Sequence, residues 1–308
     1  MVERVPPIAH TIESRVTVPP YDHLKDGDPK NPGAQFKEWI GKNSEKFFNR
    51  FAAYTFSTLQ KLNARNPGKI DVGDFIHSLM PEKRLLSSPY PVAKFYEEMQ
   101  KLNTEFSGDS SNHTHANTFL KGTTEYFPDV KFTNARKVYV NPPLESAANF
   151  VRAFYKSIET LKVPIHGSKI HTEGMEEDEK GGSYAKQGHN TFVVYLADDR
   201  TMPYLLQAIA NAERDSGVQL NSYEKADVPK TPTLLGGKVI LGGADIKHAD
   251  DRETRSFDTW TDGVANAARQ AFLKNPNLTE VEALQVMRAE LTKRTGKEAK
   301  EYLYPKTP

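Results

Sequence analysis

The residues most capable of catalysis or phosphate binding lie in and around the polar segments that connect apolar segments in the second half of the chain. Lys169 lies in the segment VPIHGSKI, and His171 follows it by two residues. A lysine can bind phosphate as a point charge or act as a base, and a neighbouring histidine can supply the acid of an elimination. If this segment is a regular strand, residues 167, 169 and 171 share one face. The alternative is that both side chains are polar groups at the solvated end of a strand.

A second group of candidates precedes the apolar segment TFVVYL, which is typical of a buried strand. Tyr184, Lys186 and His189 lie in this approach segment. Segments that lead into a buried strand often hold functional groups, because the strand fixes their position. His189 could protonate a leaving phosphate and Tyr184 could help to position it. The alternative is a flexible loop rich in Gly and Ser.

Two arginines form a third candidate group, in the segment DDRETRSF. Arg252 and Arg255 could clamp a phosphate in bidentate fashion, as Lys186 could hold it with a single charge. The acidic residues beside them could equally neutralise both arginines in a surface cluster of ion pairs.

The sequence gives little support for a bound metal ion or a cofactor. His113 and His115 have HxH spacing, but no third ligand stands at a compelling distance along the chain. The chain has no Walker A motif, no GxGxxG after a strand, no HExxH and no GxSxG. We therefore expect no bound metal and no cofactor.

Composition narrows the function classes further. The formal net charge is +1 over 308 residues, so no global field favours nucleic acid or an anionic membrane. The absence of cysteine removes disulfides, thiolate nucleophiles and zinc–thiolate sites. No segment is apolar enough for a transmembrane helix, and the N-terminus lacks the apolar core of a secretory signal. A cytoplasmic protein is the expectation.

Periodicity predicts a helical first half. Residues 1–34 are rich in Pro, Asp and Lys and are expected to form an extended or partly disordered leader. Apolar residues at helical spacing predict helices over 36–63 and 90–102. The polar segment 107–117 is expected to be a loop or linker. A mainly helical region would thus cover residues 35–130, either as a separate unit or packed together with residues 131–308.

Residues 131–308 are expected to form an α+β domain. Two strand–helix–strand units in succession predict a split βαβ arrangement, an antiparallel or mixed sheet with helices packed on it. Two closing helices complete the domain, and Thr279 with Glu282 makes a capping box for the second. The predicted strands cover 137–141, 163–170, 191–196 and the run KVIL, and the predicted helices cover 144–161, 201–216, 258–273 and 279–295.

The order of these segments resembles the HopA1 family, which includes type III effectors and HopA1-like proteins of peptide-modifying gene clusters. The resemblance rests on the strand RKVYVN, a helix, the strand of Lys169, a variable loop, the strand TFVVYL, a further helix, KTPTL, a Gly-rich run and the Ser-Phe step at Ser256 and Phe257. It covers about the second half of the chain.

For the cluster-encoded relatives this resemblance implies a phosphoserine or phosphothreonine lyase in the biosynthesis of ribosomal peptide natural products such as lanthipeptides and thioamitides. A separate kinase phosphorylates the precursor peptide, and the lyase expels phosphate to leave a dehydroamino acid. Our leading hypothesis is such a metal-independent lyase. Lys169 is its base or electrostatic anchor, His189 or His171 the acid, Tyr184 a positioning group, and Lys186, Arg252 and Arg255 the phosphate ligands.

The chain also departs from the family pattern. Asn190 and Gly188 stand where the family usually has Asp and often has Arg, and Asp258 stands where Gly is usual. These departures and the leader-like N-terminus motivate a second hypothesis, a non-enzymatic effector secreted into a host cell or another peptide-binding protein. A third hypothesis is a partner subunit that presents a substrate to another enzyme.

Overall fold

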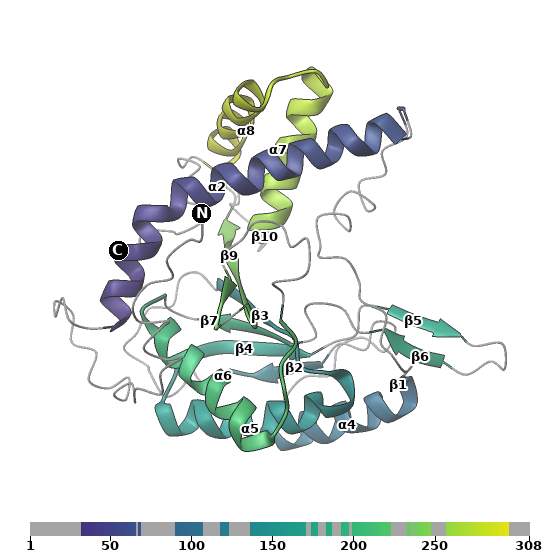
Figure 1. Ribbon diagram of the computed structural model, residues 1–308, viewed down its shortest axis with the longest axis vertical. Helices are drawn as coiled ribbons and strands as arrows, with labels where there is room; N and C mark the ends of the chain where they lie inside the picture. Colours follow the sequence, from purple (N-terminus) through teal and green to yellow (C-terminus); the bar gives the residue numbers. More distant parts are fainter. Residues whose placement is uncertain are drawn as a thin grey trace. The chain divides into compact units, whose positions relative to one another are not determined.

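The computed structural model describes most of the segments from which the sequence predicts structure. The described residues are 32–65, 67–68, 90–106, 118–122, 136–170, 174–177, 183–186, 192–196, 199–222, 233–235, 237–247 and 257–295. They divide into two compact units, drawn in Figure 1. The predicted linker 107–117, His113 and His115 lie outside the described residues, as does the predicted leader up to residue 31.

The first unit is built on a sheet whose middle strand is β7 (Phe192–Leu196). β3 (Arg136–Val140) and β4 (Ile165–Ile170) pair with β7 on its two sides, both in antiparallel fashion. β2 (Thr118–Lys121) pairs antiparallel with the far side of β4. β9 (Val239–Lys247) lies beside β3, and its first residues belong to this unit.

Two helices make the connections across this sheet. α5 (Ala147–Leu161) connects β3 to β4, and β7 lies between these two strands. α6 (Met202–Ser216) follows β7 and leads through β8 (Thr233–Leu234) to β9, with β3 between β7 and β9. Each connection is a split βαβ unit, and together they give the βαββαβ order of ferredoxin-like folds. The predicted α+β class is confirmed.

The two helices lie side by side on one face of the sheet (Figure 1). The side chains of β3 alternate between buried and half-buried, which is the period of a strand with one face against a core. Phe192 of β7 meets Phe150 and Phe154 of α5 edge to face, with ring centroids 5.9 and 5.1 Å apart. Such aromatic pairs add to the burial of apolar area that holds the helices on the sheet.

A buried ion pair fixes the first residue of β3 within this core. The guanidinium of Arg136 donates to both carboxylate oxygens of Asp199, and its Nη2–Oδ2 distance is 2.7 Å. Asp199 begins the short 3-10 turn η5 (Asp199–Thr201) that leads into α6. The pair thus connects the first residue of β3 to the short turn that leads into α6, the helix that packs on the sheet.

A smaller three-stranded sheet is formed by two strands from the polar loop between β4 and β7 and one strand that precedes α4 (Val92–Glu105). Its order is β1 (Tyr90–Pro91), β6 (Ser183–Lys186) and β5 (Gly174–Glu177). The sequence predicted a variable loop here and no strand. The helix predicted from residue 90 begins two residues later, because Tyr90 and Pro91 pair with β6 before α4 starts.

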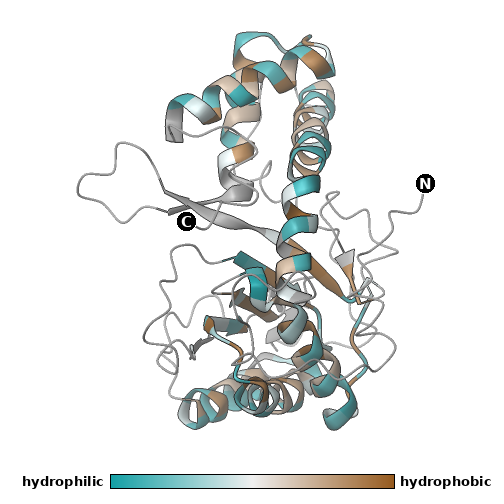
Figure 2. Ribbon diagram, turned by 90° about the vertical axis from the view of Figure 1, so that its left-hand side faces the viewer, coloured by the Kyte–Doolittle hydropathy of each residue, from teal (hydrophilic) through white to brown (hydrophobic). Residues whose placement is uncertain are grey.

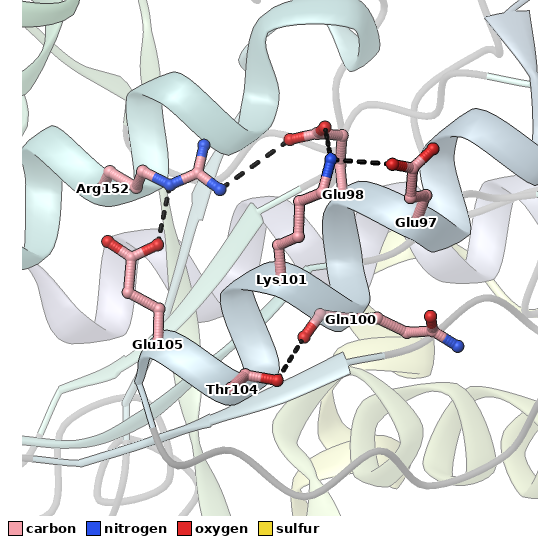
Figure 3. A network of polar contacts seen from close by, with 7 residues as sticks. All are labelled: Glu97, Glu98, Gln100, Lys101, Thr104, Glu105 and Arg152. Carbon is pink, nitrogen blue, oxygen red and sulfur yellow. Dashed lines mark hydrogen bonds and ion pairs between the residues drawn. The ribbon is translucent and has the colours of Figure 1, made fainter.

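A polar network connects α4 to α5 (Figure 3). Arg152 of α5 donates to Glu105 at 2.8 Å and lies 3.8 Å from Glu98. Lys101 pairs with Glu97 and Glu98 of its own helix at 2.8 and 3.1 Å. Exposed pairs of this kind contribute little to stability. The buried face of α4 carries more of the packing, through Phe95, Met99 and Leu102.

The described residues of the second unit are mostly helical and include one strand pair. It contains α2 (Pro32–Arg65) from Ile40 onward, α7 (Trp260–Lys274) and α8 (Glu280–Thr295). Hydrophobic residues recur along α2 between hydrophilic ones, as the predicted amphipathic helix requires (Figure 2). β10 (Phe257–Thr259) pairs with the end of β9, so α7 begins at residue 260 and not at the predicted 258.

The predicted capping box at the start of α8 is confirmed. The backbone N–H of Thr279 donates to the Glu282 carboxylate at 2.8 Å, and the N–H of Glu282 donates to the Thr279 hydroxyl at 3.4 Å. The Thr279 hydroxyl also donates to the Glu282 carboxylate, and this bond together with the one from the Thr279 backbone N–H lowers the pKa of Glu282. No helix within the described ranges is both long enough and apolar enough to cross a membrane.

Candidate anion-binding face of the sheet

Lys169 lies on the face of the main sheet opposite α5. Its neighbour Ser168 is buried, and the Ser168 hydroxyl lies 2.9 Å from the hydroxyl of Tyr155 on α5. Because successive side chains of a strand point to opposite faces, Lys169 points away from α5. The Lys169 side chain is half-buried there.

The strand register shows which residues share this face. Lys169 of β4 pairs with Val193 of β7, and Val193 pairs with Tyr139 of β3. In the adjacent row Tyr195 pairs with Lys137 of β3. We call these five residues the lysine face: Lys137, Tyr139, Lys169, Val193 and Tyr195.

The lysine face consists of two lysines, two tyrosines and the apolar residue Val193. Val193 is buried, whereas the two lysines and the two tyrosines are half-buried. The Lys137 ammonium lies 5.9 Å from the centroid of the Tyr195 ring, within the range of a cation–π contact. Lysine is depleted in strands, so two half-buried lysines on one sheet face are not what packing alone favours.

A β-bulge lies in β4 next to the strand position that pairs with Tyr195. The pairing of β4 with β7 shifts register between Ile165 and Gly167, which makes His166 the extra residue. Gly167 pairs with Tyr195 and carries no side chain that could cover the ring. Its φ of 155° is one that residues with a Cβ rarely adopt. His166 is exposed, and residues 167 and 169 share one face as predicted.

The backbone places two more of the predicted residues on the small sheet. Tyr184 of β6 pairs with Glu176 and with Pro91, and Lys186 pairs with Gly174. β5 follows β4 after three residues, and four Cα steps span at most about 14 Å. The hairpin of β5 and β6 therefore leaves the main sheet at the end of β4 that Lys169 approaches. Whether Tyr184 and Lys186 act with Lys169 stays a prediction.

The remaining predicted site residues are outside the described part of the chain. His171, His189, Arg252 and Arg255 belong to this group, and their roles stay predictions. Among the residues that the structure describes, no three His, Asp or Glu side chains are grouped closely enough to hold a metal ion.

Lys137, Tyr139 and Tyr195 were not predicted as site residues from the sequence. The signal was present in the alternation of RKVYV, which sets Lys137 and Tyr139 on one face and the buried residues on the other. What the alternation does not reveal is that β3 lies two strands from Lys169, because that depends on pairing between distant segments.

The bond between Tyr155 and Ser168 fixes the orientation of β4 and gives a testable prediction. Burial raises the pKa of the Tyr155 phenol well above its ordinary value, and the bond to Ser168 opposes that rise only in part. Tyr155→Phe or Ser168→Ala each leaves a buried hydroxyl without this partner, which costs about 1–3 kcal/mol. The double variant should cost less than the sum of the two single variants, since no hydroxyl is then left unpaired. Urea unfolding of the four proteins measures this, and strictly additive losses would contradict it.

Comparison with known proteins yields distant structural similarity and no match in sequence. No protein-family model and no curated protein matches the chain. The structure of an effector protein from Pseudomonas syringae pv. tomato strain DC3000 is similar with a TM-score of 0.47 and 12% identity, over 86% of this chain and 98% of that one. An effector structure from Pseudomonas syringae pv. syringae strain 61 gives the same TM-score and identity, over 85% and 97%.

Proposed function

We propose that this protein eliminates phosphate from phosphoserine or phosphothreonine in a peptide and leaves a dehydroamino acid. The observation that carries the proposal is the position of Lys169, half-buried on a sheet face that it shares with a second lysine and two tyrosines. An elimination needs a base at the Cα proton and positive charge near the departing phosphate. The resemblance of the strand order to HopA1-like lyases supports the same choice.

The step assigned to Lys169 is a proton abstraction. The neutral amine takes the proton from Cα, and the electron pair of the broken C–H bond forms the double bond between Cα and Cβ. The bond between Cβ and oxygen breaks, and phosphate leaves with that electron pair. An acid then protonates the phosphate. In the proposal this acid is His189 or His171, while Lys186, Arg252 and Arg255 hold the phosphate and Tyr184 positions it.

The two tyrosines of the lysine face could stabilise the negative charge that develops in this step. Proton abstraction places negative charge on the peptide carbonyl oxygen next to Cα. The phenol groups of Tyr139 and Tyr195 stand on the same face as Lys169 and can donate to that oxygen. Donors that are already in place need no reorganisation while the charge forms, which is the main source of such stabilisation.

The proposal is tested by mass spectrometry of phosphopeptides incubated with the purified protein, without added metal or nucleotide. Elimination removes the elements of phosphoric acid and gives a product that adds thiols. Hydrolysis removes less mass, because water is added back, and leaves an ordinary serine or threonine. We expect the first product, and a hydrolysed product alone would contradict the lyase.

A second candidate function is phosphopeptide binding without chemistry. The departures at Gly188, Asn190 and Asp258 favour it, since the HopA1 family often has Arg, usually has Asp and usually has Gly at these three positions. In that case the protein is an effector or a partner protein that recognises a peptide phosphorylated by a separate kinase. Peptides that bind and are recovered unchanged, whatever their sequence, would support this candidate over the lyase.

A further inference from the structure

We infer that Gly122 is a positioning residue for Lys169. Because it has no side chain, it lets the end of β2 pack directly on the bulge of β4 that turns Lys169 to the face of the sheet away from α5. The inference rests on the proposed function for what Lys169 does on that face. It adds a residue that neither the sequence pattern nor the resemblance indicated.

The bulge decides which face of the sheet Lys169 occupies. Ile165 and Ile170 are both completely buried, and both pair with residues of β7 on the face that contacts α5 through Phe192. They are five residues apart, and in a regular strand two residues an odd number apart point to opposite faces. The extra residue His166 removes this conflict. If His166 were paired like its neighbours, Lys169 would lie opposite Phe192 in the core beneath α5.

Gly122 contacts the backbone of this bulge. It follows β2 directly, and Lys121, the last residue of β2, pairs with Gly167. A Cβ at residue 122 would lie 2.2 Å from the carbonyl oxygen and 2.4 Å from the carbonyl carbon of His166, and 2.5 Å from the carbonyl oxygen of Ile165. Real Cβ atoms essentially never come within 3.0 Å of another such atom. All three atoms belong to the backbone, so no side chain can turn aside to make room.

This contact sets the position of the β4 backbone three residues before Lys169. A side chain at residue 122 must push β2 and β4 apart by about 1 Å, and a strand within a packed sheet transmits such a shift along its length. A misplacement of about 1 Å is enough to lower the rate of a reaction about a hundredfold. The φ of Gly122 is one that any residue adopts, so the position requires glycine for its lack of a side chain and not for its backbone freedom.

The test compares Gly122→Ala with two other glycine variants. Gly33→Ala would set its Cβ 2.2 Å from the carbonyl oxygen of Arg200, which is an equal clash with backbone in the same unit, on η5 and not on β4. Gly41→Ala meets nothing within 4 Å and controls for the change of residue type alone. Each variant is assayed in the presence of a stabilising osmolyte, and urea unfolding gives the fraction that is folded.

Turnover and binding are measured separately. The kcat for phosphate elimination comes from mass spectrometry of a phosphopeptide at saturating concentration. The Kd comes from fluorescence anisotropy of a peptide with the phosphonate analogue of phosphoserine, which has no ester oxygen and cannot be eliminated. A third readout depends on neither turnover nor binding. Lysine labelled with 13C at Cε gives an NMR signal for each lysine, and Lys169→Arg and Lys156→Arg identify the signals of Lys169 and of the exposed Lys156 on α5.

We expect Gly122→Ala to lower kcat about tenfold to a hundredfold and to leave the Kd of the phosphonate peptide close to that of the wild-type protein, since a displaced base affects the reaction more than binding. The NMR signal of Lys169 should move, and that of Lys156 should not. Gly33→Ala should lose stability but keep the wild-type kcat and the wild-type signal of Lys169. Gly41→Ala should match the wild type in all three readouts, with equal or higher stability, because glycine inside a helix is destabilising relative to alanine.

The outcomes separate this inference from the proposed function. No elimination by the wild-type protein contradicts the proposed function, while a Lys169 signal that moves only in Gly122→Ala still supports the control of its position by Gly122. An unmoved Lys169 signal, an unchanged kcat, or an equal fall of kcat in Gly33→Ala overturns the inference and leaves the proposed function standing. A Gly122→Ala protein that does not fold where Gly33→Ala folds assigns residue 122 to the fold alone and also overturns the inference.

Discussion

Replacement of Lys169 by methionine is expected to lower kcat/KM for phosphate elimination by about a hundredfold to ten-thousandfold, the usual contribution of a general base. Methionine keeps a flexible side chain of similar length, so the packing of the half-buried stem against its neighbours is largely preserved. The melting temperature should therefore stay close to that of the wild-type protein. Mass spectrometry of the peptide over time measures the rate.

Two further variants separate the possible roles of Lys169. Lys169→Arg keeps the positive charge but supplies no base, because a guanidinium does not lose its proton in proteins. A loss as large as that of Lys169→Met indicates a base, whereas a partial recovery indicates an electrostatic anchor. Lys156→Met makes the same change of charge on exposed α5 and should leave the rate unchanged. Near-normal turnover by Lys169→Met would remove Lys169 from the mechanism.

The largest loss of stability is expected from breaking the pair between Arg136 and Asp199. Arg136 is 2% exposed, and its guanidinium makes a bidentate contact with the Asp199 carboxylate. Asp199→Ala removes this carboxylate from beside the buried guanidinium and should lower the free energy of unfolding by about 3–5 kcal/mol. Because the pair joins β3 to the start of α6, urea unfolding should show the loss as a lower transition midpoint.

The controls for this pair use both of its partners and an exposed pair of similar chemistry. Replacing Arg136 by Met and Asp199 by Leu together should recover much of the loss, since an apolar pair removes the uncompensated charge. Glu105→Ala breaks the exposed contact with Arg152 and should cost no more than about 1 kcal/mol. A loss for Asp199→Ala as small as that for Glu105→Ala would show that the buried charge is compensated elsewhere.

The parts of the fold that the sequence predicted are those with strong periodicity. α5 places Phe150, Phe154 and Ile158 on one buried face, and β3 alternates between buried and half-buried residues, so both are visible in the sequence. β5 and β6 were missed because GMEE and SYAK show neither strong alternation nor an apolar run. β2 was missed because TFLK is only four residues long and comes after a polar segment. Such short strands are specified by the strands beside them.

The site was predicted only in part, for a related reason. The sequence indicated Lys169 and the polar segments that follow its strand as candidate site residues, because functional groups often lie in the segments that connect strands and helices. Lys137 and Tyr195 lie inside strands, where alternation alone makes them ordinary surface residues. Their place on the same sheet face as Lys169 results from the antiparallel pairing of β7 with both β3 and β4, which connects residues far apart in the chain. No local pattern contains that information.

The central claim is that a phosphopeptide binds on the lysine face, and covalent mapping tests it most directly. A phosphonate peptide with a photoreactive residue next to the phosphonate is bound to the wild-type protein, irradiated and digested, and the labelled fragments are sequenced by mass spectrometry. We predict labels within 137–139, 167–169 and 193–195, competed away by unlabelled phosphopeptide. Competed labels confined to the helices α7 and α8 of the other unit would contradict the claim.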